Sequence, residues 1–236
     1  PLSWQIAGVG DVNGDGKADV IWRKNTSGTV AVWLMNGSTI VSTGYPAGVP
    51  LTWQISGVGD VDGNGTDDIV WRHNSGLVAV WFMNGVTITS AGYPAGVSLD
   101  WQIQQVGDLN GDGKADLVWR NTSTGGVAVW LMNGSTIVSS GYPPGVPLAW
   151  QISGVGDVDG NGTADIVWRH ASSGAVSVWF MNGATIMSSG FPASVSLDWV
   201  IKQVEDLNGD GKADLVWRNT SRLVAVWLMN GLNISS

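Results

Sequence analysis

The sequence predicts an all-β fold, a five-bladed β-propeller with four antiparallel strands in each blade. Three observations lead to this prediction: a repeat of about 48 residues, strand-like patterns within each copy, and the lack of a sustained helical period. The 236 residues include 15 Trp and 34 Gly but 3 Phe and 3 Tyr, which would place three Trp in each of five copies. Self-similarity at a fixed spacing is the signature of a repeat architecture.

The Trp residues fall into three columns that define the copies. One column precedes a Gln-Ile or Val-Ile pair in steps of 49, 48, 49 and 49 residues, at Trp4, Trp53, Trp101, Trp150 and Trp199. The other two columns are Trp22, Trp71, Trp119, Trp168, Trp217 and Trp33, Trp81, Trp130, Trp179, Trp227. No linker interrupts the pattern, so we expect a single domain over 1–236, with blades at approximately 1–49, 50–97, 98–146, 147–195 and 196–236.

Each copy contains four segments rich in β-branched and aromatic residues. In the first copy, strands are expected at WQIAGVG (4–10), ADVIWRK (18–24), TVAVWLM (29–35) and STIVST (38–43). A turn at 25–28 separates the second strand from the third, and Asn36 with Gly37 gives a strong hairpin signal after the third. Four antiparallel strands in a unit of this length, repeated without helices, are typical of a propeller blade.

The third strand of each copy indicates that the sheets are covered on both sides. Val30, Val32 and Leu34 alternate with Ala31, Trp33 and Met35, so both faces of this strand are apolar. A blade packed between two neighbours needs this pattern, whereas a sheet with one wet face would alternate with polar residues. Five whole blades are present, and we expect the first and fifth to pack face to face.

An acidic loop follows the first strand of every copy, with the pattern D-x-[ND]-G-[DN]-G-x-x-D. Oxygen atoms at places one, three and five converge when a backbone coils around a hard cation, and place seven supplies a carbonyl. Gly stands at place six because the turn needs a positive φ, and Asp at place nine closes the shell. The candidate metal ligands are Asp11, Asn13, Asp15, Lys17, Asp19; Asp60, Asp62, Asn64, Thr66, Asp68; Asp108, Asn110, Asp112, Lys114, Asp116; Asp157, Asp159, Asn161, Thr163, Asp165; and Asp206, Asn208, Asp210, Lys212, Asp214.

The distribution of acidic residues favours metal binding over ordinary turns, in which Asp, Asn and Gly are also common. Fifteen of the 19 acidic residues lie at the pattern's Asp positions in these loops, three in each, leaving Asp67, Asp100, Asp198 and Glu205 elsewhere. Three carboxylates within nine residues repel one another unless a cation neutralises them. We expect about five Ca²⁺ ions, one per blade, and prefer Ca²⁺ to Mg²⁺ because so many protein oxygens converge.

The loop, its place between the first two strands and the repeat spacing resemble the FG-GAP/VCBS repeats of integrin α-subunit heads and many secreted bacterial proteins. The resemblance covers the whole chain. It implies structural Ca²⁺ on one rim of a propeller and a role in adhesion or carbohydrate recognition, and a fungal propeller lectin has similar calcium loops. Members of the family commonly have seven blades, so five blades are a departure.

A Trp-Arg pair on the second strand of each copy has two interpretations. As a sugar pocket, the indole would stack on a pyranose and the guanidinium would donate to its hydroxyl or carboxylate groups. Alternatively, Trp fills the interface between blades and Arg reaches a neighbouring carbonyl or carboxylate. The candidate ligand-binding residues are Trp22, Arg23, Trp71, Arg72, Trp119, Arg120, Trp168, Arg169, Trp217 and Arg218.

Composition excludes several functional classes. The net charge of −8 argues against a nucleic-acid partner and against electrostatic docking to an anionic membrane, and no apolar run is long enough to span a bilayer. Cysteine is absent, which removes disulfides, thiolate nucleophiles and Cys-ligated metals. His73 and His170 occupy matching places, yet no Ser/His/Asp arrangement recurs and no acid pair stands outside the loops. We therefore expect no enzymatic activity.

These observations lead to a hypothesis of a non-catalytic, calcium-binding, lectin-like recognition module with several similar sites, for which multivalency would strengthen weak binding. The alternative is a protein-interaction, adhesion or scaffold domain of a larger secreted protein. The sequence begins at Pro1 without an initiator Met or signal peptide, and we expect a secreted protein whose leader or flanking sequence is not part of this chain.

Overall fold

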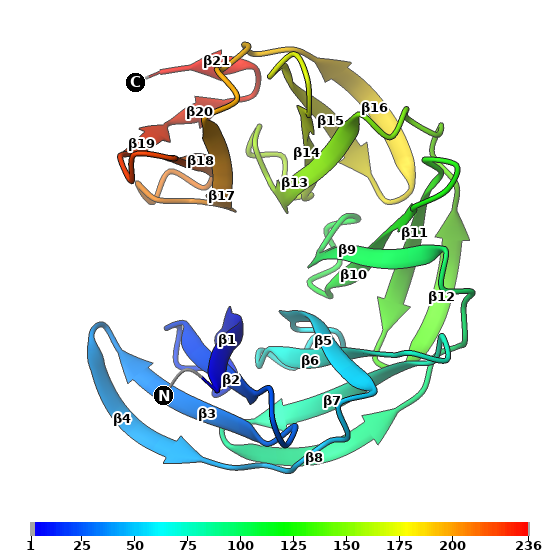
Figure 1. Ribbon diagram of the computed structural model, residues 1–236, viewed down its shortest axis with the longest axis vertical. Helices are drawn as coiled ribbons and strands as arrows, with labels where there is room; N and C mark the ends of the chain where they lie inside the picture. The colour runs from blue at the N-terminus through cyan, green and yellow to red at the C-terminus, as the bar shows by residue number, and fades with distance from the viewer. Residues whose placement is uncertain (1–2, 236) are drawn as a thin grey trace. The chain divides into compact units, whose positions relative to one another are not determined.

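A computed structural model describes residues 3–235 of the chain, and the regular elements of this range are 21 β-strands (Figure 1). The chain is all-β, a five-bladed β-propeller with four antiparallel strands per blade, and the predicted fold class is confirmed. No helix in the described range is long and apolar enough to cross a membrane.

The first four blades are four-stranded sheets in which the strands follow one another in chain order. Their strands are β1 (Trp4–Gly10), β2 (Asp19–Lys24), β3 (Val30–Asn36), β4 (Thr39–Gly44); β5 (Trp53–Gly59), β6 (Asp68–His73), β7 (Val78–Asn84), β8 (Thr87–Gly92); β9 (Trp101–Gly107), β10 (Asp116–Asn121), β11 (Val127–Asn133), β12 (Thr136–Gly141); and β13 (Trp150–Gly156), β14 (Asp165–His170), β15 (Val176–Asn182), β16 (Thr185–Gly190). Each predicted strand of the first copy lies within one residue of the observed one at either end.

The fifth blade is divided into two small sheets. Its inner part consists of β17 (Trp199–Glu205), β18 (Asp214–Asn219) and β19 (Val224–Trp227), and its outer part of β20 (Met229–Asn230) and β21 (Asn233–Ile234). The division falls at Leu228, whose carbonyl accepts the backbone N–H of Ser235 at 2.8 Å. The third strand of this copy is therefore interrupted where the other copies continue.

The chain forms two compact units. The first consists of Pro1–Val106, Gly113–Leu117 and Met132–Ser139, and the second of Gly107–Asp112, Val118–Leu131 and Ser140–Ser236. Each unit has its own apolar core: Val12, Ile69 and Trp71 belong to one cluster of the first unit, and Val158, Leu215 and Trp217 to one of the second. A single domain over the whole chain stays a prediction.

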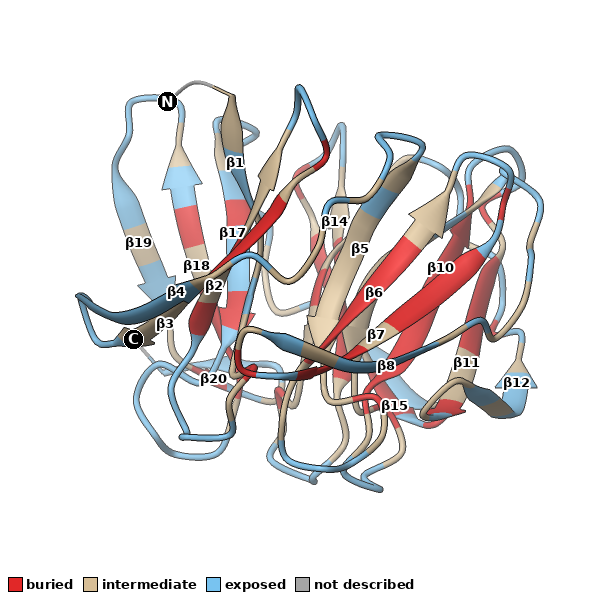
Figure 2. Ribbon diagram, turned by 90° about the horizontal axis from the view of Figure 1, so that it is seen from below, coloured by how far each residue is buried: buried red, intermediate tan, exposed pale blue. Residues whose placement is uncertain are grey.

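The middle strands carry the core, as the two apolar faces of the third strand predict. Val30 and Val32 are fully buried, and Ala31 between them is 4% exposed although it points to the opposite face. Figure 2 shows the same difference between strands, with buried residues along β6, β7 and β10 and exposed ones along β8. In the first four blades, burial on both faces of the second and third strands packs each sheet against apolar side chains, whereas Val224 and Val226 of β19 are exposed.

A β-bulge interrupts the first strand of the blades at a repeated place. The register of β5 against β6 shifts between Ile55 and Gly57, and that of β17 against β18 shifts between Ile201 and Gln203. The unpaired residues are therefore Ser56 and Lys202. Bulges redirect side chains and are common next to functional sites, and both of these residues line cavities described below.

Candidate functional site

The acidic loops join the first strand of each blade to the second, and their first Asp organises the backbone. In the first copy, Asp11 Oδ1 accepts the N–H of Gly14 at 2.8 Å, and its Oδ2 accepts the N–H of Gly16 at 2.7 Å. The glycine at the sixth place has a positive φ, 79° for Gly16 and 86° for Gly65, as the sequence pattern predicted. Short loop bonds of this type coil the backbone and turn its oxygens inward.

The last Asp of each loop is fully buried at the start of the second strand, at Asp19, Asp68, Asp116, Asp165 and Asp214. Two backbone amides hold it: Asp68 accepts the N–H of Met83 at 3.0 Å and of Val61 at 3.1 Å. In the first copy, Asp19 Oδ2 is buried with no hydrogen-bond partner among the described residues. A buried carboxylate oxygen without a donor is an unfavourable arrangement that a cation would relieve.

Two of the loops bring three carboxylates together. Asp60, Asp62 and Asp68 each offer one oxygen, and these oxygens lie within 4.8 Å of one another; Asp157, Asp159 and Asp165 repeat the arrangement. All six belong to the predicted ligands. Clustered carboxylate oxygens are the donors that hard divalent cations prefer, so these two triads could hold metal ions.

The remaining loops place their acids differently, because the third place is Asn rather than Asp. In the first copy the third acid is Asp15, whose Oδ2 lies 3.4 Å from Lys17 Nζ. In the fifth copy Asp210 Oδ2 accepts an N–H of Asn208 at 3.3 Å. Among the residues described, the acids of these two loops do not form a triad like those of copies two and four.

Burial raises the pKa of the innermost Asp residues. The pKa of Asp68 and that of Asp165 rise to about 7, chiefly through loss of hydration and in part through repulsion from the other acids of each triad. Burial raises the pKa of Asp19 in the same direction. The metal-free sites therefore resist carrying their full negative charge at neutral pH.

The metal-free protein is expected to lose thermal stability as the pH rises from 5 to 8. The folded-state pKa of Asp68 and Asp165 lies above the value of about 3.9 in an unfolded chain, so their contribution is greatest below pH 4 and is lost through pH 7. The measurement is Tm by circular dichroism across this pH range in excess chelator. The Asp68→Asn and Asp165→Asn double variant should flatten the profile, and a wild-type Tm that rises from pH 5 to 8 would contradict the prediction.

Each of the first four loops is also bonded to the blade that follows it. The carbonyl of Asp60 accepts the N–H of Ala115 at 2.6 Å, and that of Val61 accepts the N–H of Gly134 at 2.9 Å. At the seventh place, Thr66 Oγ1 donates to Met83 O at 2.8 Å. These bonds join a loop's conformation to the packing of two successive blades.

The predicted Trp-Arg pairs lie on β2, β6, β10, β14 and β18. The indole is part of the core in the last four, whereas Trp22 on β2 is half-buried. Trp71, Trp119, Trp168 and Trp217 are each 1% exposed. Each packs against the Trp of the third column in its own blade in a tilted arrangement, with ring centres 4.6–4.8 Å apart. The geometry matches the interpretation in which these Trp residues fill the interior, and it leaves no free indole face for a sugar in those four pairs.

The paired Arg residues reach across to the next blade. Arg23 donates to the carbonyls of Gly28 (2.8 Å), Val49 (2.9 Å), Pro50 (3.1 Å) and Trp53 (3.0 Å). Its guanidinium lies 4.9 Å from the ring centre of Trp71. Arg120 and Arg169 make equivalent contacts with Trp168 and Trp217. These Arg residues therefore connect blades through carbonyl bonds and a cation–π contact.

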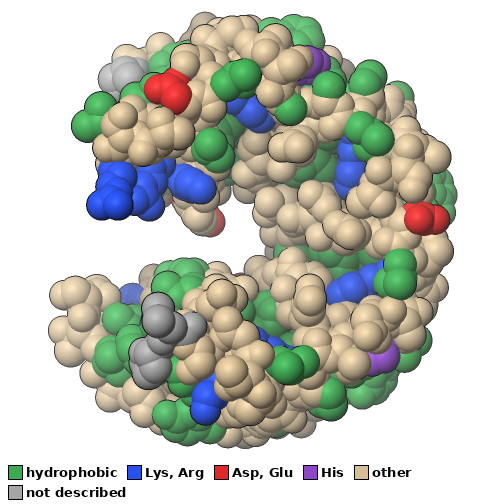
Figure 3. Space-filling view, in the orientation of Figure 1, with side chains coloured by type: hydrophobic (Ala, Val, Ile, Leu, Met, Phe, Trp, Pro, Cys, Tyr) green, Lys and Arg blue, Asp and Glu red, His purple; other side chains and the backbone are tan. Residues whose placement is uncertain are grey.

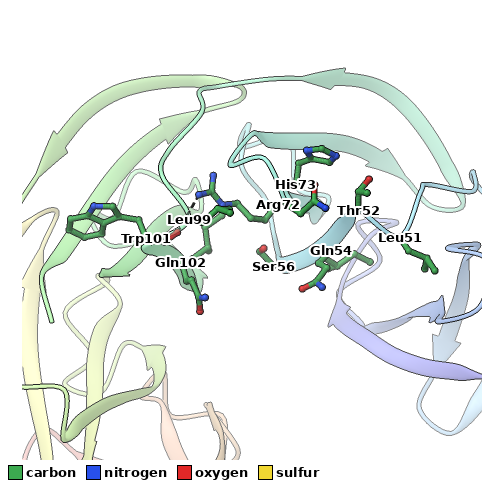
Figure 4. Close-up of a pocket in the computed structure, with 12 residues that line it drawn as sticks. Leu51, Thr52, Gln54, Ser56, Arg72, His73, Leu99, Trp101 and Gln102 are labelled. Atoms are coloured by element: carbon green, nitrogen blue, oxygen red, sulfur yellow. Dashed lines mark hydrogen bonds between the residues drawn. The ribbon is translucent and has the colours of Figure 1, made fainter. Parts of the chain in front are cut away.

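A cavity of about 590 Å³ in the first unit was not predicted from the sequence. It is lined by Leu51, Thr52, Gln54, Ile55, Ser56, Arg72, His73, Asn74, Leu99, Trp101, Gln102 and Ile103. Gln54 and Ser56 lie on β5 and Gln102 on β9, and Figure 4 shows their side chains extending toward the same space. The sequence signal that could have predicted this cavity is the pair of polar residues, Gln54 and Ser56, at alternate positions of the otherwise apolar strand β5.

Two charged or titratable residues of this cavity are already engaged. Arg72 donates to the carbonyls of Gly76 and of Val97, the latter at 2.6 Å. His73 Nδ1 lies 2.6 Å from Ser75 Oγ, and its ring is 4.7 Å from that of Trp53. The lining residues include no Asp, Glu or Lys. The polar surface available to a ligand is thus composed mainly of amides and hydroxyls.

These sheets and loops define a tandem-repeat β-propeller with acidic loops that could hold metal ions. The family model for the FG-GAP-like repeat matches residues 11–71, 60–119 and 108–168, and the chain belongs to this family. The predicted family membership is confirmed. None of the curated proteins matches the chain in sequence.

Solved structures show the same fold at low sequence identity. A chain in the crystal structure of a nidogen/laminin complex superposes with a TM-score of 0.64 and 13% identity, covering 99% of this chain and 80% of that one. Streptogramin B lyase gives 0.55 and 8%, covering 98% and 70%. Chaetomium thermophilum Raptor gives 0.55 and 12%, covering 94% and 19%. At these identities the likeness concerns the fold alone.

Proposed function

We propose that this protein is a non-catalytic recognition module, stabilised by calcium, that binds a neutral carbohydrate outside the cell. The observation that carries the proposal is the cavity of about 590 Å³ between β5 and β9. Its volume falls in the range of about 300–1,000 Å³ that is usual for small-molecule sites. The cavity is large enough for one or two sugar rings.

The chemistry of the lining supports an uncharged polyol as ligand. The side-chain amides of Gln54 and Gln102 and the hydroxyls of Thr52 and Ser56 both donate and accept, as sugar hydroxyls do. Leu51 and Leu99 add apolar surface for the C–H face of a pyranose. A charged ligand would find no free counter-charge among these residues.

Calcium is the metal that best fits the acidic loops. Carboxylates, Asn amides and backbone carbonyls are a hard all-oxygen donor set, and three carboxylate oxygens converge in each of the two triads. Asp60, Asp62 and Asp68, with Asn64 and the carbonyl of Thr66, would hold one ion, and the equivalent residues of the other loops would hold the rest, about five in all. The ion would neutralise the carboxylates and fix the loop.

Screening of a glycan array in Ca²⁺, followed by calorimetry, is expected to identify a neutral sugar that binds weakly at this cavity. Gln102→Ala should reduce its affinity about tenfold, because each lost hydrogen bond to a polar ligand leaves a partner unsatisfied. Gln151→Ala is the matched control, since Gln151 occupies the same column but does not line this cavity. The absence of binding to any glycan in Ca²⁺ would overturn the proposal.

Exposed aromatic residues favour a second candidate, binding of a protein partner. Tyr45, Tyr93, Tyr142 and Phe191 stand at equivalent places after the fourth strand, and their exposed fractions are 68%, 68%, 73% and 68%. Aromatic residues are enriched at protein interfaces. If the glycan screen is negative, the decisive measurement is the affinity of the Tyr93→Ser variant for an identified, purified protein partner. A protein-binding module should lose affinity for the partner in this variant, whereas a lectin would not bind that partner.

A further inference from the structure

The fifth blade contains a counterpart of the cavity described above, with a different chemistry. This cavity has a volume of about 350 Å³ and lies wholly in the second unit. It is lined by Asp198, Val200, Lys202, Arg218, Asn219, Thr220 and Arg222. Counting from the first-column Trp of each blade, six of these residues occupy the places of Thr52, Gln54, Ser56, Arg72, His73 and Asn74. The two cavities are thus the same place in two repeats.

Replacements at this place add two cations, and one acid at Asp198, to the single Arg that both cavities share. Lys202 stands where the second blade has Ser56, on the bulge of β17, and Arg222 stands where it has Gly76. Val200 removes the amide of Gln54. Figure 3 shows Lys and Arg side chains gathered over β17 to β19, although the chain as a whole carries a net charge of −8.

Arg222 has a positive φ, a backbone conformation that is adopted by glycine at the equivalent place of the second blade. Its φ is 70°, and it is the one non-glycine residue in the described range with a positive φ. The equivalent glycine of the second blade, Gly76, has a φ of 95°. A side chain with a β-carbon is strained in this region, and such strain is retained chiefly where the residue has a use.

The guanidinium of Arg218 is available, in contrast to its counterparts. Arg72 and Arg120 are held by backbone carbonyls of the following segment. Arg218 is exposed and makes no hydrogen bond or ion pair with the residues that the structure describes. The one carboxylate of the cavity, Asp198, accepts the hydroxyl of Ser196. Three cations therefore face this cavity against one acid.

We propose that this cavity of the fifth blade is an oxyanion site for an acidic sugar, with Arg218, Arg222 and Lys202 as donors to its sulfate or carboxylate group. Guanidinium groups bind such oxyanions through paired N–H donors, and an ammonium adds a point charge. The volume of about 350 Å³ exceeds what an inorganic ion fills and suits a single sugar ring. The site does not depend on the function proposed for the cavity of the second blade.

Isothermal titration calorimetry at low ionic strength tests the proposal with four probes: galactose 6-sulfate, galacturonic acid, sodium sulfate and neutral galactose. We expect one of the acidic sugars to bind in the millimolar range or better, and the sulfate and carboxylate arms to show which oxyanion is preferred. Arg222→Gly and Lys202→Ser restore the residues of the second blade, and each should weaken binding about tenfold. Lys24→Asn, a lysine outside the cavity exchanged for the residue at that place in blades three and five, is the control.

Stability provides an independent readout of the same variants. Arg222→Gly should unfold at an equal or higher temperature than the wild type, because glycine adopts the positive φ without strain. Lost binding with retained stability would support the site. Binding of acidic sugars that survives both Arg222→Gly and Lys202→Ser, or no binding of either acidic sugar to the wild type, would overturn it, whatever the second blade binds.

Discussion

Chelation of the proposed calcium ions with EDTA is expected to lower the Tm of this protein by about 10–20 °C. A ligand that binds only the folded state stabilises it by about 2.7 kcal/mol per site when its free concentration is 100 times Kd. For the two Asp triads alone this gives about 5 kcal/mol, and about 1 kcal/mol corresponds to ~2–4 °C in a chain of this size. The measurement is thermal unfolding by circular dichroism in excess CaCl₂ and in excess EDTA.

The triads themselves provide the control for the chelation experiment. The Asp62→Asn and Asp159→Asn double variant keeps the loop backbone bonds of Asp60 and Asp157 but removes one carboxylate from each triad. Its Tm should differ less between CaCl₂ and EDTA than the wild-type Tm does. Wild-type melting curves that coincide in the two solutions would rule out structural calcium.

Replacement of Arg120 by Ala is expected to destabilise the protein by about 3–5 kcal/mol. The side chain is 6% exposed, donates to the carbonyls of Gly125, Val146, Pro147 and Trp150, and lies 5.0 Å from the ring of Trp168. Its removal takes one donor from the half-buried carbonyls of Val146, Pro147 and Trp150 and uncovers an indole face, while the carbonyl of Gly125 keeps the N–H of Val146. Urea unfolding followed by Trp fluorescence measures the change in the free energy of unfolding.

The same repeat supplies a matched control for Arg120. Arg218 occupies the same column in the fifth blade but is exposed and has no hydrogen bond with the described residues. Arg218→Ala should therefore change stability by less than about 0.5 kcal/mol, as is usual for surface sites. Equal losses for the two variants would show that the carbonyl bonds of Arg120 do not contribute as the geometry indicates.

The repeat allowed the strands and loops to be predicted because their signals are local. These signals depend only on residues that are close together in the sequence. They are the apolar residues on both faces of the strand at Val30 to Val32, the turn at Gly37 and the spacing of Asp11 and Asp19. The observed strands of the first copy begin and end within one residue of the predicted ones. The two-sided burial of the third strand followed from the same local pattern, since Ala31 and Val32 are both apolar although they face opposite sides.

The role of the Trp-Arg pairs could not be decided from the sequence, because the deciding contacts join residues 27–30 positions apart in different repeats. A Trp in every copy is compatible with a core position and with an exposed site. The carbonyls that receive Arg23, at Val49, Pro50 and Trp53, have no sequence signal, since every residue has a carbonyl.

Asp67 is a second feature that sequence reasoning missed. It stands at the variable eighth place of its loop, where the other copies have Ala18, Ala115, Ala164 and Ala213. In the structure its Oδ2 accepts the backbone N–H of Asp11 at 2.7 Å, and burial raises its pKa to about 6. The exchange of Ala for Asp at one place in five was visible, but its partner belongs to the preceding copy.

The Arg side chains form hydrogen bonds that cross the boundaries between sequence copies, so the units that stabilise one another do not coincide with the copies. Arg23 of the first copy donates to the carbonyl of Trp53 in the second copy. The carbonyl of Asp60 in the second copy accepts the N–H of Ala115 in the third. No single 48-residue copy contains both partners of these bonds. A newly duplicated copy therefore carries donors and acceptors whose partners are already present in the copies on either side of it. An array of this kind can lengthen by insertion without inventing a new contact.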